Sequence, residues 1–420
     1  MLALSRRLII VSLSIALIVT SLILQYGVFE EFPPFPYFDE VYTLSAAKVV
    51  ASDPSSLATD HPPLVPYLMQ VSQNLFGEGP AAWRLPARLC GSLSLAAVFL
   101  IGFSLTGSVI GPLFGAVALL FDGLFLTLTR TATWDTPYVC FGLWALLAAL
   151  SASHQKNLTL TYALYLVTAG LLGLSISCKW AGLFFFAPIA VAILLGRTPR
   201  GTLQRATAVM AIPFVALSVY LVVTCLLRRL SLLEFFDQTK HVFTFHINFI
   251  QPHRYVSPPW SWPLLVRPLW FGYQELPYLA SDGSQAARGM ICLGNPAVFL
   301  ITGLSTFALL CILVRDAIQK LLFLPIMVPI VGYLSCWIPW MLFTNRNGFI
   351  YYFYPSLTFA CIGLGVTISR LWTRGRWIAT LCGFALSLII ICGALYFPVY
   401  FSIPTSQEYM ETLLFRESWW

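Results

Sequence analysis

Charged residues are scarce in this sequence. Lys, Arg, Asp and Glu make up 10% of its 420 residues, whereas 58% are hydrophobic and 32 are Phe. Soluble globular domains carry roughly 25% charged residues, so this composition excludes a soluble protein. Charge-free apolar runs recur along the chain, and a membrane-spanning helix needs about 20 apolar residues. We therefore predict an integral multi-pass membrane protein.

Several common functional signals are also missing. The ten cysteines include no Cys-x-x-Cys pair, so the pattern of a zinc site or a disulfide framework is absent. No internal repeat of about 20 to 50 residues is visible, which favours neither a solenoid nor an inverted-repeat transporter. No nucleic-acid-binding signature is present. The net charge of +7 comes largely from short loops, where basic residues contact anionic membrane lipids.

The apolar runs predict an all-α bundle of about eleven transmembrane helices. The run from Leu89 to Phe121 would be about 50 Å long as one helix, longer than a bilayer core of about 30 Å, and we read it as a hairpin of two spans. The first run is predicted to be an uncleaved span, because no small-x-small cleavage motif follows it. The expected helices lie near residues 8–24, 89–106, 109–128, 134–153, 158–178, 180–196, 206–227, 291–314, 321–343, 348–369 and 377–397.

Positive charges in the short loops predict the orientation. With eleven spans, one side of the membrane carries Arg6, Arg7, Lys156, Arg197, Arg200, Arg205, Arg315, Lys320, Arg370, Arg374 and Arg376. The positive-inside rule makes this side the cytoplasm, so the N-terminus is cytoplasmic and the C-terminus extracytoplasmic. Of the 17 acidic residues, all except Asp316 fall outside or at outer helix ends. The outer face is therefore the expected place of the chemistry.

Two long outer segments divide the chain. We expect an N-terminal transmembrane catalytic module over residues 1–228, which includes the first outer loop at 25–88. A second outer loop spans 229–290, and a C-terminal four-helix module with an outer tail spans 291–420. Neither loop has room for a large separate domain, so both should pack on the bundle as short surface helices that roof a cavity.

The first outer loop holds an adjacent carboxylate pair, Asp39 and Glu40, followed by His61 in DHPPL. Neighbouring residues on a helix point about 100° apart, so the two carboxylates cannot address one atom. Asp39 is expected to face the reaction, although it could instead cap the helix that starts at Glu40. His61, before two prolines, either positions a substrate or only forms a rigid turn.

More ionisable residues sit at the predicted outer helix ends. They are Arg84, Arg88, Asp122, Arg130, Asp135, Lys179 and Arg346. Such side chains often merely extend to the interface, but charges retained near a membrane commonly line a polar cavity. Lys179 interrupts two apolar runs without a polar loop around it, which favours a functional cation that binds phosphate.

Two other features have a simpler interpretation. His241, His246 and His253 lie in the second outer loop, and their spacing does not place them on one helix face, so exposed loop histidines are favoured over a metal site. The aromatic segment from Trp260 to Trp270 could stack on sugar rings, but Trp near an interface is more often a membrane anchor.

Ordered motifs in this chain resemble the protein O-mannosyltransferase family. They are FDEVY, then DHPPL, then SPPWSWPLLVRPLWF, then LGNPAVFL, then WIPWMLFTNRNGFIYYFYPSL. RTATWDTPYVCF and SCKWAGLF also resemble the fourth span and the fifth-to-sixth turn of the family. The resemblance covers residues 37–364 and implies a polytopic enzyme of the glycosyltransferase C fold.

The resemblance implies a function. A sugar, most simply mannose, would pass from a polyprenyl phosphate to Ser or Thr hydroxyls of a secreted or membrane protein, with inversion and without a metal or cofactor. The outer loop is too short for the lectin-like domain of eukaryotic members, which matches short bacterial members and a bacterial inner membrane. Tyr352 and Phe353 stand where the family typically has His and Tyr, which leaves the sugar and the acceptor open. The oligomeric state is not indicated.

The chemistry assigns roles to the candidates. A departing phosphate needs cations, and the acceptor hydroxyl needs a base. We predict Asp39 as the base with Glu40 beside it, and His61 and Asp135 as acceptor-positioning residues. The cations predicted for the donor phosphate are Lys179, Arg130, Arg346, Arg84 and Arg88, of which the last two could instead pair with Asp39 or Asp135.

Two alternatives stay open. WRLPARL, residues 83–89, is similar to a segment of the related aminoarabinose transferases, which favours a glycolipid or envelope polymer as acceptor. A lipid or sugar transporter is the lesser alternative, because intramembrane charges also mark transporters. Transporters would place their charges at the bilayer midplane, whereas here they gather at outer helix ends.

Overall fold

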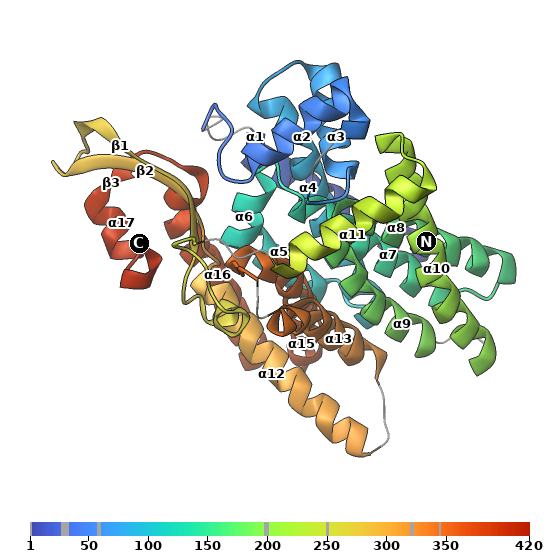
Figure 1. Cartoon of the computed structure of the whole chain (residues 1–420). Helices are drawn as coiled ribbons and strands as arrows, with labels where there is room; N and C mark the ends of the chain where they lie inside the picture. The colour runs from blue at the N-terminus through green and yellow to red at the C-terminus, as the bar shows by residue number, and fades with distance from the viewer. Residues whose placement is uncertain are drawn as a thin grey trace.

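Helices dominate the computed structural model of this protein, which describes residues 2–26, 33–56, 60–196, 201–248, 252–319, 323–343 and 346–420 (Figure 1). Arg197, Arg200 and Lys320, used above for orientation, lie outside the described residues. In the described part, nine helices are long and apolar enough to cross a membrane. The protein is therefore a multi-pass membrane protein, as the composition predicts.

The nine candidate spans follow the predicted apolar runs. They are α1 (Leu2–Tyr26), α4 (Pro80–Thr106), α7 (Asp135–Ser153), α8 (Leu158–Cys178), α10 (Thr202–Arg228), α12 (Pro296–Ile318), α13 with α14 (Leu324–Trp337, Pro339–Leu342), η4 with α15 and η5 (Ile350–Phe353, Tyr354–Leu371, Trp372–Arg374), and α16 (Arg376–Phe401).

Two of the eleven expected spans depart from a straight transmembrane helix. The segment expected at 109–128 consists of α5 (Ile110–Leu120) and α6 (Gly123–Thr129), bent by 63° at the break between them. The segment expected at 180–196 consists of η2 (Trp180–Phe185) and α9 (Phe186–Leu194), which together are shorter than a span. The count of eleven is therefore not confirmed. α4 also begins at Pro80 instead of near residue 89, so Arg84 and Arg88 belong to that helix and not to the loop before it.

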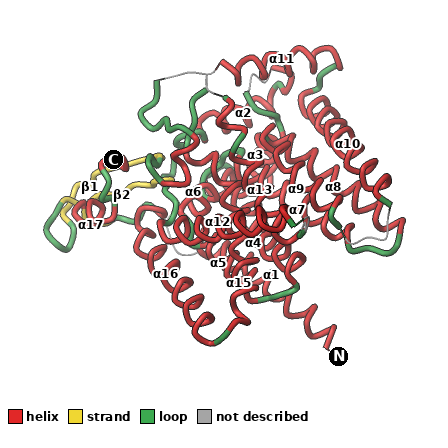
Figure 2. Tube along the Cα trace, turned by 90° about the horizontal axis from the view of Figure 1, so that it is seen from below, coloured by secondary structure: helices red, strands yellow, loops and turns green. Residues whose placement is uncertain are grey.

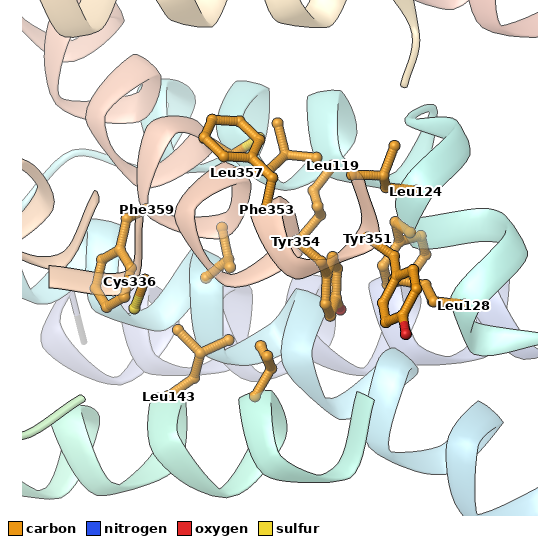
Figure 3. Close-up of a cluster of buried hydrophobic side chains, with 14 of the residues drawn as sticks. Leu119, Leu124, Leu128, Leu143, Cys336, Tyr351, Phe353, Tyr354, Leu357 and Phe359 are labelled. Carbon is orange, nitrogen blue, oxygen red and sulfur yellow. The ribbon is translucent and has the colours of Figure 1, made fainter. Parts of the chain in front are cut away.

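The centre of the bundle is the span that contains α15. In its most apolar window 89% of the residues are buried, against 17% in α1 and α16. α15 packs against α4, α5, α12 and α13. A Cβ atom at Gly111 of α5 would lie 2.2 Å from the carbonyl oxygen of Gly365 in α15, so the small residue permits close backbone approach. Figure 3 shows Phe353, Tyr354 and Leu357 of this span within the apolar core.

The break between α5 and α6 is held by a buried polar junction. Asp122 caps α6 by accepting from the Leu124 N–H at 2.8 Å, and its other oxygen accepts from the Asn295 N–H at 2.9 Å. The Asn295 side chain caps α12 and donates to the carbonyls of Phe121 and Ile389 at 3.0 Å each. This explains the Asn-Pro of LGNPAVFL: Asn caps the helix, and Pro occupies its first position, where no N–H is needed.

The segment predicted as the first outer loop forms short helices, as expected. They are α2 (Glu40–Ser52), η1 (Pro54–Ser56) and α3 (Leu64–Phe76). The second outer loop contributes α11 (Leu232–Asn248) and η3 (Pro259–Leu264). The helices predicted in both loops are thus present.

The second outer loop also contains strands that the sequence analysis does not predict. β1 (Leu269–Leu279) pairs antiparallel with β2 (Gln285–Cys292), which pairs with β3 (Thr405–Ser406) of the tail. Asp282-Gly283 lies between β1 and β2, a dipeptide typical of hairpins, and could have indicated them. The tail continues through α17 (Gln407–Leu413) and η6 (Glu417–Trp419). Figure 2 shows the sheet and α17 together at one side of the bundle.

We predict that Asn295→Ala destabilises the protein by about 3 kcal/mol, because it leaves two buried carbonyls and the start of α12 without partners. Thermal unfolding of the detergent-solubilised protein measures the effect. Asn74→Ala, at an exposed position of α3, is the matched control and should change stability little. Equal effects of the two variants would contradict the role of the junction.

Candidate active site

Asp39 and Glu40 point to different surroundings. Asp39 occupies the N-cap position of α2, but its side chain makes no capping hydrogen bond. Its Oδ2 accepts from the Tyr351 hydroxyl at 3.3 Å. Glu40 is fully buried. The alternative in which Asp39 serves as a helix cap is therefore not seen, and the two carboxylates are separated as helix geometry requires.

Glu40 is enclosed by an ion pair. Its two oxygens accept from Nε and Nη2 of Arg84 at 2.8 and 2.9 Å, and Oε1 also accepts from the Ala132 N–H at 2.8 Å. Arg84 is itself buried and also donates to the Pro33 carbonyl. A carboxylate and a guanidinium held this way tie α2 to α4 and to the segment before α7. The structure therefore pairs Glu40 and Arg84 with each other, and the catalytic role expected for Glu40 and the phosphate-binding role expected for Arg84 stay predictions.

Asp39 lies near a second ion pair. Lys179, between α8 and η2, donates to Oδ1 of Asp135 at the start of α7 over 2.8 Å. The Lys179 ammonium also lies 4.8 Å from the centre of the Tyr352 ring and 5.6 Å from that of Tyr351, so cation–π attraction holds it as well. An ammonium has three N–H donors, so this pair leaves donors for an anionic ligand.

Burial sets the acidity of Asp39. Desolvation of its carboxyl group is the largest cause and raises its pKa, the Lys179 charge and the Tyr351 hydrogen bond lower it, and the charge of Asp135 raises it. Together these causes raise the pKa from 3.8 to about 6. A carboxylate with a raised pKa is a better proton acceptor than an ordinary one and stays ionised at neutral pH. The residues around Asp39 thus suit a general base.

The segment with His61 lies beside a third group of polar residues. The His61 ring centre is 4.6 Å from that of Trp134 and 5.0 Å from that of His246. His246 contacts the Asp60 carbonyl through Nε2, and its Nδ1 accepts from Nη1 of Arg346 at 2.6 Å. Arg346 also donates to the Tyr352 hydroxyl at 3.4 Å. These contacts join α11, the segment Asp60–His61 and η4.

Both histidines are neutral at pH 7. Burial and then the Arg346 charge lower the pKa of His246 to about 3, and burial followed by the Lys179 charge lowers that of His61. A neutral His246 donates from one ring nitrogen and accepts at the other, as its two contacts require. The interpretation of His246 as an exposed loop residue is thus wrong, because this side chain orients Arg346.

Two other predicted cations belong to the packing of the bundle. Arg88 lies over the Tyr26 ring of α1 at 4.0 Å. Arg130 donates to the Gln25 carbonyl at 3.0 Å and lies over the Phe401 ring of α16. Both are buried. These contacts hold the C-terminal end of α1 against the bundle. Among the predicted cations, Lys179 and Arg346 are the two that the structure places around Tyr352.

Tyr351 and Tyr352 are the site residues that sequence reasoning missed. They come from η4, immediately before the central helix α15. Tyr351 donates to Asp39, and Tyr352 lies between Lys179 and Arg346. The motif FIYYFYPSL marks this segment, but the sequence does not show which of its side chains reach the charged residues. Tyr351 and Tyr352 connect Asp39, Lys179 and Arg346 only through tertiary contacts.

Two family models match most of the chain. The model for dolichyl-phosphate-mannose-protein mannosyltransferase matches residues 60–228. The model for the C-terminal four-transmembrane region of protein O-mannosyltransferase matches residues 231–419. Of the predicted site residues, Asp39 and Glu40 precede these ranges and the others fall within them.

Curated relatives agree with the family models. The chain is 24% identical over 445 residues to a polyprenol-phosphate-mannose–protein mannosyltransferase of Corynebacterium glutamicum, with 88% of this chain and 83% of that protein covered. It is 24% identical to the protein of that name from Mycobacterium tuberculosis, with 91% of this chain and 86% of that protein covered.

Solved structures share the fold. The S. cerevisiae protein O-mannosyltransferase Pmt1–Pmt2 complex bound to the sugar donor gives a TM-score of 0.82 at 13% identity, covering 98% of this chain and 92% of that chain. ArnT from Cupriavidus metallidurans bound to undecaprenyl phosphate gives 0.60 at 16% identity, covering 94% of this chain and 65% of that chain. These likenesses confirm the predicted fold class.

Arg84→Met should destabilise the protein by about 3 to 5 kcal/mol, because it leaves the buried carboxylate of Glu40 without its cation. Thermal unfolding in detergent is the measurement. Arg315→Met is the matched control, since Arg315 pairs with Asp316 but has a side chain that is 65% exposed, and such pairs contribute under about 1 kcal/mol. A small effect of Arg84→Met would show that the Glu40–Arg84 ion pair does not stabilise the fold around the site.

Proposed function

This chain belongs to the protein O-mannosyltransferase family, and we propose that it transfers a mannosyl group from a polyprenyl phosphate to Ser or Thr hydroxyls of a protein. The observation that carries the proposal is Asp39, a carboxylate with a raised pKa beside the Lys179–Asp135 ion pair. Base and cation thus meet in one place, as the transfer requires. We further propose that the site faces the outside of a bacterial inner membrane, with a cytoplasmic N-terminus and an extracytoplasmic C-terminus.

The proposed reaction is a single displacement. The acceptor hydroxyl oxygen attacks the anomeric carbon, and its proton passes to Asp39. The bond from the anomeric carbon to the phosphate oxygen breaks, and the polyprenyl phosphate leaves with the electron pair, which inverts the anomeric centre. The donor already carries a good leaving group, so the proposal needs no cofactor.

The cations would stabilise the departing phosphate. Lys179 is held by Asp135 at 2.8 Å, and Arg346 is oriented by His246 at 2.6 Å. Fixed positive groups aimed at the place where charge develops stabilise a transition state without reorganising. Asp135 and His61 lie next to these groups, and we propose that they position the acceptor.

The acceptor is what separates this proposal from its alternative. ArnT, whose structure this chain resembles with a TM-score of 0.60, supports the fold but not the choice of acceptor. A transferase that modifies a glycolipid would use the same base and the same cations. Transfer from radiolabelled polyprenyl phosphate mannose into separated protein and lipid fractions therefore decides between a protein and a lipid acceptor.

Asp39→Asn should abolish transfer of label into protein, because an amide cannot accept the hydroxyl proton. Membranes that contain Asp237→Asn, at an exposed position of α11, are the control and should keep wild-type transfer. If the wild type transferred label only into lipid, the acceptor would be a glycolipid and not a protein. Full transfer by Asp39→Asn would exclude Asp39 as the base.

Lys179→Ala should raise the KM for the donor about 10- to 100-fold, because a hydrogen bond to a charged group contributes about 1.5 to 3 kcal/mol. Lys240→Ala, at an exposed position of α11, should leave this KM unchanged. Thermal unfolding of both variants checks that the unpaired Asp135 does not unfold the protein. An unchanged KM in folded Lys179→Ala would remove Lys179 from the phosphate site.

The pH dependence follows from the pKa of Asp39, which burial raises to about 6. The base must be ionised, so kcat/KM should be half-maximal near pH 6, rise to a plateau as the pH increases above that value, and be lost as the pH falls below it. Initial rates between about pH 5 and pH 8 give this profile. An acid limb near pH 4, the range of an ordinary carboxyl group, would contradict a buried base.

A further inference from the structure

Phe38, the residue before Asp39, has an unusual backbone conformation. Its φ is +50°, in the left-handed region that bulky residues rarely adopt. Among the described residues, the other non-glycine positions with positive φ are Arg229, Leu265 and Ser402, each of which ends a helix. Left-handed residues are common at helix ends, whereas Phe38 lies just before a helix begins. Something must therefore hold Phe38 in this conformation.

Two aromatic rings from distant parts of the chain enclose the Phe38 ring. Phe271 of β1 stacks on it with ring centres 4.6 Å apart and an angle of 26°. Tyr351 meets it edge-on at 5.7 Å and 84°. Tyr351 also donates to Asp39, so one residue contacts both the Phe38 ring and the carboxylate that follows it.

The tail fixes the start of β1, and with it Phe271. Trp270 donates from Nε1 to the Trp419 carbonyl at 2.8 Å, and its ring lies 6.0 Å from that of Trp420. Trp419 is buried and donates to the Leu265 carbonyl at 2.7 Å. Figure 1 shows the C-terminus beside this hairpin. Trp419 and Trp420, adjacent at the end of the tail, thus anchor the segment that carries Phe271.

We propose that Phe38 and Phe271 are positioning residues that aim Asp39 at the acceptor, and that Trp419 secures Phe271 for this purpose. This inference rests on the proposed function, in which Asp39 is the base. If the Phe271 ring is lost, Phe38 can relax to a common backbone conformation, and this relaxation turns the side chain of the next residue. The tail then acts on the reaction through β1, without touching either substrate.

The first test is Phe271→Leu, assayed for transfer with polyprenyl phosphate mannose and an acceptor protein. We expect kcat to fall about 10- to 100-fold, since small misplacements of a catalytic group have effects of this size, whereas the KM for the donor stays unchanged. Phe271→Tyr keeps the stacking ring and should restore kcat. Phe384→Leu, at an exposed position of the membrane helix α16, is the matched control.

The pH profile separates positioning from a general loss of packing. Asp39 is faced by Lys179, Asp135 and Tyr351, none of which is changed in these variants. Loss of the Phe271 ring admits water to Asp39, which lowers the pKa of its carboxyl group from about 6 toward its ordinary value. The acid limb of kcat/KM should therefore move to lower pH in Phe271→Leu and return in Phe271→Tyr.

Phe38→Gly provides a second variant if Phe271→Leu fails to fold. Glycine adopts the left-handed conformation without strain, so this variant keeps the backbone geometry available but removes the ring. A drop in kcat supports the proposal, and wild-type kcat in Phe38→Gly overturns it. Trp419→Ala should lower kcat in the same way, whereas Trp377→Ala, at a Trp that is 85% exposed, should not.

Asp39→Asn, measured in parallel, distinguishes failure of the proposed function from failure of the positioning role of Phe38 and Phe271. If this variant keeps full transfer, the proposed function fails. If Asp39→Asn is inactive while Phe271→Leu and Phe38→Gly both keep wild-type kcat and acid limb, the positioning role alone is overturned.

Discussion

The cost of burying charge among membrane helices determines how this site is built. An ionised carboxylate or ammonium without a partner is strongly destabilising in such surroundings. Glu40 is therefore closed off by Arg84, and Asp135 by Lys179, each at 2.8 Å. Asp39 differs, because its carboxylate accepts from a neutral phenol, that of Tyr351, and its pKa is raised in consequence of burial. Paired charges thus form the framework, and the incompletely compensated one is available for proton transfer.

The segments between the long helices place these charges rather than merely covering them. α2 brings Asp39 to the bundle, and the Glu40–Arg84 pair locks α2 onto α4. η4, just before the most enclosed helix, supplies Tyr351 and Tyr352. The tail and β1 reach the same place through Phe271 and Phe38. Segments from both ends of the chain therefore contact the residues around Asp39.

The sequence predicts much of the fold and part of the site. Long apolar runs predict the bundle, because the bilayer requires helices of nearly fixed length. The bend between α5 and α6 escaped this reasoning, since it depends on the Asp122–Asn295 junction across the structure. Lys179 is indicated by its charge between two apolar runs, and Asp39 by its place in the carboxylate pair of FDEVY. The pairing of Glu40 with Arg84 and the roles of Tyr351 and His246 depend on tertiary contacts, which spacing along the chain does not show.

We propose that Asp39 and Lys179 act on one reacting centre, Asp39 on the acceptor hydroxyl and Lys179 on the donor phosphate. A cryo-EM structure of the protein with a bound, unreactive polyprenyl phosphate mannose analogue tests it most directly. The account predicts a phosphate oxygen about 3 Å from the Lys179 ammonium, with the anomeric carbon between that phosphate and Asp39. A phosphate held elsewhere, with the sugar directed away from Asp39, would contradict the account.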